Sequence, residues 1–112
     1  MNMQIEALAT GVVKVVLAGR MDAAGAGAID LQFNAIAGSH RGLIVDMGAV
    51  DFLASIGIRT LMLGAKTMQR RGGALILLAP RPEVLEVLEI TGVLDLLPVV
   101  ATPEEAARRV GL

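Results

Sequence analysis

Apolar residues along the chain form short runs and longer helical spacings, and each kind of pattern predicts a different element. Five short runs predict β-strands, at residues 3–7, 12–17, 43–47, 74–79 and 96–100. The first alternates apolar and polar residues, which predicts a half-exposed edge strand. The next three are almost wholly apolar, as strands covered on both faces are. The last contains Pro98, which favours an edge strand or the start of a strand because proline cannot donate to a neighbouring strand.

Four stretches between and after these runs predict helices. The first follows Asp22, a candidate N-cap, and the second ends at the glycine pair 72–73. Their expected core faces, at steps of three and four, are Ile29, Phe33 and Ile36, then Ile58, Leu61, Met62, Ala65 and Met68. Two shorter helices are expected over 82–91 and 102–110, and each has a proline suited to a first helical turn.

The resulting order, β-β-α-β-α-β-α-β-α, predicts an α/β fold with a mostly parallel sheet of about five strands and about four helices. The turn at Thr10 and Gly11 is too short for a crossover, so the first two strands should pair antiparallel. A chain of 112 residues fits one domain, and we expect a single domain over residues 1–112.

Composition excludes several classes of protein. Apolar residues make up 54% of the chain, but the charged residues, at 19%, interrupt every run before it could span a membrane. The N-terminus does not have the pattern of a signal peptide, and cysteine is absent. The net charge is −1 and aromatic residues make up 2%, so neither a basic surface nor a stacking platform indicates nucleic acid. We expect a cytoplasmic protein without membrane insertion and without a nucleic-acid partner.

Catalytic patterns are also missing, so we do not expect an enzyme. His40 is the only histidine and follows a loop serine, and no cysteine is available to pair with it as a nucleophile. The segment "ASIGI" lacks the leading glycine of the G-x-S-x-G nucleophile elbow, and no phosphate-binding G-x-x-x-x-G-K-[ST] loop is present. The strand ends lack the acidic pair of a phosphoacceptor receiver domain. We therefore expect no catalytic residue, cofactor or metal.

The segment "DFLASIGIRTL", residues 51–61, places Ser55 where a strand ends and a helix begins. One interpretation is a simple N-cap, in which the hydroxyl accepts a backbone N–H. The other is a phosphorylation site, because the free N–H groups and the positive end of the helix dipole can hold a phosphate. The residues alone leave both interpretations open.

Four segments resemble a known family: "VVKVVLAGRMDAAGAGAI", "GLIVDMGAVDFLASIGIRTLM", "RRGGALILLAP" and "ITGVLDLLPVVATPEEA". In order and spacing they are similar to STAS domains, and in particular to stand-alone anti-sigma-factor antagonists. The resemblance implies a small α/β fold and a partner anti-sigma factor that is also a serine kinase with a histidine-kinase-like ATPase fold. It also implies that phosphorylation of Ser55 ends the capture of that kinase. The family commonly has Asp-Ser-Ser-Gly here, whereas this chain has Ala-Ser-Ile-Gly at 54–57, which leaves Ser55 as the single hydroxyl.

The resemblance also implies that Asp22 lies close to Ser55. We expect a partner-binding surface at Asp22, Ser55, Ile56, Gly57 and Arg59. Ile56 and Arg59 are three residues apart and so share a side of the second helix, away from its expected core face. An alternative function is that of an accessory STAS subunit, which docks through the same helix on the ATPase of a lipid-transport ABC complex. The two hypotheses predict different partner ATPases.

Overall fold

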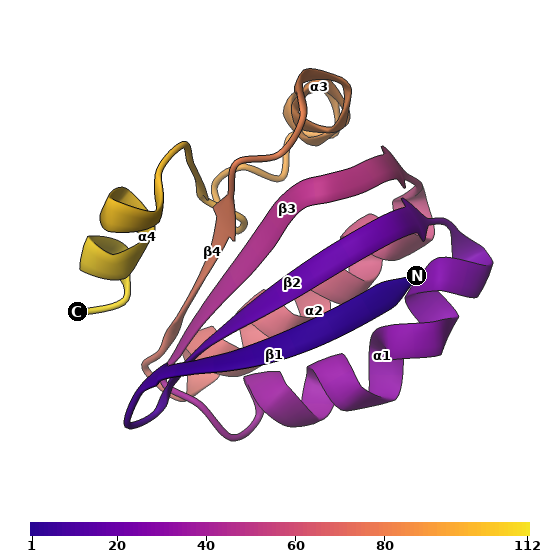
Figure 1. Cartoon of the computed structure of the whole chain (residues 1–112). Helices are drawn as coiled ribbons and strands as arrows, with labels where there is room; N and C mark the ends of the chain where they lie inside the picture. Colours follow the sequence, from indigo (N-terminus) through magenta and orange to yellow (C-terminus); the bar gives the residue numbers. More distant parts are fainter.

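The structure is a computed structural model that describes residues 1–112, and it contains one five-stranded sheet with helices on both faces (Figure 1). The strands are β1 (Asn2–Ala9), β2 (Val12–Met21), β3 (Gly42–Leu53), β4 (Ala74–Leu78) and β5 (Val99–Val100). The helices are α1 (Ala23–Ala37), α2 (Ser55–Arg70), α3 (Pro82–Ile90) and α4 (Pro103–Arg109). The strands lie in sequence order within the sheet. As predicted, β1 is antiparallel to β2 and the remaining pairs are parallel.

The three apolar runs form the centre of the sheet, as their pattern predicts. Val15 of β2 is in register with Val45 of β3, which is in register with Leu77 of β4, and all three are fully buried. The helices α1, α2 and α3 add to the same buried cluster, for example through Phe33 and Leu88. This cluster is the main core, and it holds α1 and α2 against one face of the sheet.

The opposite face is covered only in part. Its buried cluster consists of Val12, Ile44, Ile76, Leu78, Val100, Ala106 and Val110, with the last two contributed by α4 and the residue after it. Because α4 packs on β4 and β5, the residues Lys14 and Val16 of β2 remain half-exposed. The prediction that residues 12–17 are covered on both faces is therefore wrong for this part of β2. Lys14 forms an ion pair with Asp46 there, at 3.8 Å.

Two central strands continue past their predicted ends. The strand β2 reaches Met21 and β3 reaches Leu53, whereas the apolar runs ended at residues 17 and 47. The pairing register of β2 with β3 shifts on either side of Ala18 and Gly19, and Gly19 has a φ of +108° that glycine adopts without strain. After these irregularities the pairing resumes, and both strands continue to the starts of α1 and α2.

The two strands on the other side of the sheet are shorter than predicted. The strand β4 ends at Leu78, because Ala79 has a φ of +52°, outside the range of a strand. The strand β5 has only 2 residues of the 96–100 run, since Leu96 and Leu97 instead close a turn with Val93. β5 lies at the edge of the sheet, as Pro98 predicts.

Replacing Leu77 with aspartate should unfold the domain. The side chain is 0% exposed and lies between two other strands, so a charge there would be buried without a partner. The penalty is several kcal/mol, a large share of a typical stability of about 5–15 kcal/mol. Leu31→Asp is the matched control, because Leu31 is 87% exposed on α1. Thermal melting checks both, and a Leu77→Asp protein that melts like the wild type would contradict the strand assignment.

Candidate functional site

The first turns of α1 and α2 lie together because β2 and β3 are parallel neighbours whose carboxyl ends lie side by side. Met21 is in register with Leu53, and the Ala54 N–H donates to the Met21 carbonyl oxygen at 3.0 Å. This bond joins the residue before Asp22 to the residue before Ser55 and so brings the two helix starts together. We call the surface made by Asp22, Ser55, Ile56 and Arg59 the Ser55 corner.

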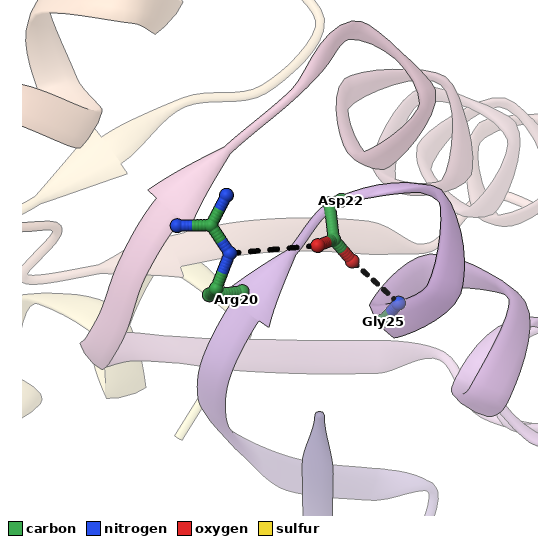
Figure 2. A network of polar contacts seen from close by, with 3 residues as sticks. All are labelled: Arg20, Asp22 and Gly25. Atoms are coloured by element: carbon green, nitrogen blue, oxygen red, sulfur yellow. Dashed lines mark hydrogen bonds and ion pairs between the residues drawn. The ribbon is translucent and has the colours of Figure 1, made fainter.

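Asp22 caps α1, as predicted. Its Oδ1 accepts from the Gly25 N–H at 2.8 Å, and its Oδ2 lies 3.5 Å from Arg20 Nε (Figure 2). The Gly25 N–H holds the pKa of Asp22 below its ordinary value, and the Arg20 guanidinium acts in the same direction. Because the pKa of Asp22 is lowered in the folded state, its ionised carboxylate stabilises the fold. This stabilisation is present above the ordinary carboxyl pKa and is lost as the pH falls through the lowered value.

Arg20 and Phe52 extend the Ser55 corner, and the sequence motifs predicted neither of them. They are in register across β2 and β3, and the guanidinium carbon of Arg20 lies 4.2 Å from the centre of the Phe52 ring. Phe52 is 39% exposed, so a large apolar ring faces solvent beside a cation. Pairing "GRMD" with "DFLAS" could have indicated the contact, but only with knowledge of the irregular register between the strands.

Ser55 is exposed and is the first residue of α2. Ala54 occupies the N-cap position, and α2 has no side-chain cap hydrogen bond, so the interpretation of Ser55 as a cap is wrong. A residue at the first helical position does not have the extended backbone from which an N-cap side chain reaches the following N–H groups.

The start of α2 differs electrostatically from the starts of the other three helices. It has neither a side-chain cap nor an acidic residue in its first turn. By contrast, α1 has the Asp22 cap, α3 has Glu83, and α4 has both a Thr102 cap and acidic residues. The start of α2 is therefore the one where the helix itself supplies neither a cap nor an acidic side chain to the free N–H groups and the positive end of the dipole.

The helix α2 has one exposed and one buried side, as its sequence pattern predicts. Ile56 is 41% exposed and Arg59 is exposed, whereas Ile58 and Leu61 are buried in the main core. Gly57 is buried as well. A Cβ at Gly57 would lie 2.7 Å from Met21 Cγ and 2.8 Å from the Met21 carbonyl oxygen, so any part of Gly57 in binding is indirect, through the close approach of α2 to β2.

Other features of the molecule lie away from the Ser55 corner. His40 Nδ1 is 2.9 Å from the Ile36 carbonyl oxygen, at the end of α1. No group of three or more metal-ligating side chains comes together, and no helix has the length and apolar character to cross a bilayer. A pocket of about 380 Å³ lies at the ends of β4 and β5, and one of about 300 Å³ lies between α4 and the strands β1 to β4. Neither includes a residue of the Ser55 corner.

Comparison with known proteins defines the class. Residues 5–106 match the model of the STAS domain family, so the chain belongs to that family. One relative is BtrV of Bordetella bronchiseptica, described as a candidate anti-sigma factor antagonist. It is 38% identical over 68 residues, which are 61% of this chain and 59% of BtrV. The chain thus matches about three fifths of the length of that relative.

Solved structures of similar proteins confirm the predicted STAS-like α/β fold. An anti-sigma factor antagonist from Mycobacterium paratuberculosis is 26% identical, with a TM-score of 0.85 over 97% of this chain and 92% of that one. The phosphorylated form of SpoIIAA, a Bacillus cell fate determinant, is 24% identical, with a TM-score of 0.74 over 96% and 98% of the two chains.

Replacing Gly57 with alanine should destabilise the protein, whereas the same change at Gly27 should stabilise it. The added methyl group at Gly57 would meet the Met21 backbone, and such overpacking costs about 1–3 kcal/mol. At Gly27, which is exposed within α1, nothing lies within 4 Å, and alanine gains up to about 1 kcal/mol of helix propensity. Chemical denaturation of the two variants measures the difference. Equal stabilities would rule out the close approach at Gly57.

Proposed function

We propose that this chain, acting as one STAS domain over residues 1–112, is an anti-sigma-factor antagonist. It binds an anti-sigma factor that has serine kinase activity and a histidine-kinase-like ATPase fold, and phosphorylation of Ser55 releases it. The Ser55 corner is the docking surface. The observation that carries the proposal is an exposed serine at the one helix start that has no cap and no acid. The relatives described as antagonists, and a SpoIIAA structure in a phosphorylated form, support it.

A phosphate on Ser55 is compatible with the fold. Its oxygens can accept from the free N–H groups of the first turn of α2. Its negative charge is stabilised by the positive end of the helix dipole by about 1 kcal/mol. Ser55 is exposed and its hydroxyl has no hydrogen bond with the rest of the chain, so modification breaks no internal contact. The direct effect of phosphorylation on folding stability should therefore be small.

The charge around Ser55 supports a large effect on binding. No acidic residue occurs between Asp51 and Glu83, while this segment contains Arg59, Lys66, Arg70, Arg71 and Arg81. Since the chain has a net charge of −1, the segment carries +5 and the remainder −6. Neither of the two ion pairs in the structure involves α2, so its exposed cations at 59, 66 and 70 are available to a partner.

A partner that fits this basic surface is acidic where it meets α2. A phosphoserine adds about −1.5 to −2 charges at the edge of that contact. Placing like charges together in an interface costs several kcal/mol, more than the phosphate gains from the helix. The partner is therefore released while the fold is kept, which is the behaviour that a switch requires.

The partner itself distinguishes the proposal from docking on an ABC transporter. Affinity capture from the source cell with the unmodified protein should recover an ATPase of the histidine-kinase-like fold. Incubation of that partner with ATP should then transfer phosphate to Ser55, and mass spectrometry locates the modified residue. Recovery of an ABC ATPase, or phosphate on another residue alone, would contradict the proposal.

Substitution of Ser55 should change binding and leave stability nearly unchanged. The free energy of unfolding of Ser55→Ala should lie within about 0.5 kcal/mol of the wild type, because the hydroxyl makes no cap bond. The variant should bind the kinase without being released. Ser55→Asp should keep the fold and weaken capture, because aspartate supplies part of the phosphate's charge. Calorimetric titration against the purified kinase, beside thermal melts, measures both. Equal affinities for the two variants would exclude Ser55 from the docking surface.

Replacing Ile56 with glutamate should abolish capture of the kinase. Ile56 is 41% exposed beside Ser55, and an apolar anchor at an interface centre is worth about 2 kcal/mol or more. Ile90→Glu is the control, since Ile90 is 77% exposed at the end of α3. Both variants should melt close to the wild type. Retained capture by Ile56→Glu, or equal loss in the control, would place the interface elsewhere.

A further inference from the structure

The strand β1 is the least covered element of the sheet. Only Met3 is half-buried within it, and the other residues from Asn2 to Ala9 are exposed. Ile5 is 47% exposed and Leu8 is 37% exposed, although both are large and apolar. Figure 1 shows β1 as the outermost strand, with β2 as its single neighbour in the sheet.

Natural proteins protect long edge strands, and β1 has little of that protection. Proline and charged side chains, lysine above all, are usual devices, and "NMQIEALA" has no proline, no lysine and a single charge, Glu6. The register of β1 with β2 is regular from Asn2 to Ala7, and its one irregularity comes after Ala7. The other edge, β5, is only 2 residues long. The outer row of backbone N–H and C=O groups on β1 is therefore free to pair with another strand.

We propose that two copies of this chain pair through β1, antiparallel, about a two-fold axis at Ile5. The sheet then continues from one copy into the other, and each copy covers the exposed edge of its partner. Ile5 packs against Ile5 of the second copy, and Met3 lies opposite Ala7. This proposal is independent of the function of Ser55.

The side-chain alternation and the charge of β1 select this register. Opposite residues in an antiparallel pair point to the same face, so the axis must pass through a residue and not between two. An axis at Glu6 would place the two Glu6 carboxylates opposite each other, and like charges in that position are destabilising. An axis at Ile5 instead places Glu6 opposite Gln4, whose amide can donate to the carboxylate.

An axis at Gln4 avoids the repulsion too but uses less of the strand. It pairs residues 2–6 and leaves Leu8 without a cross-strand neighbour, whereas the axis at Ile5 pairs residues 2–8. The Ile5 register thus gives a cross-strand neighbour to both large exposed apolar side chains of the strand. Pairing through one strand buries less than the roughly 1,200 Å² of a stable interface, so we expect a reversible dimer that dissociates on dilution.

The dimer leaves both Ser55 corners accessible. Asn2 pairs with Ala18, close to the ends of β2 and β3, so each corner lies near the start of its own β1. In the antiparallel arrangement these starts point away from each other. Two partner molecules could therefore bind at opposite ends of the dimer at the same time.

Because the chain contains no cysteine, a single introduced cysteine reports this contact directly. On a two-fold axis, Ile5→Cys lies opposite its own copy, and antiparallel Cα separations of about 4.5–5.5 Å suit a disulfide. Under mild oxidation Ile5→Cys should form a covalent dimer about tenfold faster than Leu31→Cys, because pairing raises the effective concentration of its thiols. Leu31 is the more exposed residue, at 87%, so random collision predicts the reverse order.

The register has its own control. Met3→Cys and Ala7→Cys should each cross-link slowly alone and quickly when mixed, since the axis at Ile5 places Met3 opposite Ala7. Cross-linking of Ile5→Cys no faster than Leu31→Cys would overturn the proposal, as would fast cross-linking of Gln4→Cys with none at Ile5.

The non-covalent assembly gives an independent measurement. Sedimentation equilibrium of the wild type at concentrations up to about 1 mM, where even an association with a Kd of about 1 mM is visible, should show a monomer–dimer equilibrium. Ile5→Lys should shift it to monomer with an unchanged melting temperature, because a lysine at an exposed edge blocks strand pairing without entering the core. A wild type that stays monomeric throughout this range would also overturn the proposal.

Discussion

The backbone hydrogen bond from Ala54 to Met21 is the contact on which the candidate site depends. It ties the end of β3 to the end of β2, although the two residues are 33 positions apart along the chain. The bond requires α2 to start very close to β2, and this closeness in turn requires a glycine at position 57, where a methyl group would meet Met21. A constraint on packing thus places Ser55 on the surface beside Asp22.

The two helix starts joined by this bond have opposite electrostatic character. At α1 the Asp22 carboxylate already satisfies an N–H group and compensates the dipole. At α2 the corresponding position is Ala54, which supplies neither a hydrogen bond nor a charge. The absence of a cap leaves the hydroxyl of Ser55 exposed and the N–H groups free, so that an added phosphate finds a local environment that accepts it. Under the proposed function, an acidic partner attracted by the basic residues of α2 is repelled by the same phosphate charge.

The sheet also treats its two edges differently. β5 is short and lies between turns, whereas β1 is long, regular and exposed on its outer side. The helix α4 packs mainly on β4 and β5, whereas β1 and the residues Lys14 and Val16 of β2 stay largely uncovered. The Ser55 corner and the β1 edge are separate surfaces, and one molecule can use both at once.

The sequence by itself determined the element order, the three central strands and the division of α2 into a buried and an exposed side. These follow from local periodicity, which a single strand or helix expresses without its neighbours. It also determined the capping role of Asp22, because that bond spans three residues. Only the tertiary structure decided the lengths of β2 and β3, the contact of Arg20 with Phe52, the burial of Gly57 and the uncapped start of α2 at Ser55. Each of these depends on an irregular register or on a close approach between segments far apart in the chain, for which local periodicity carries no information.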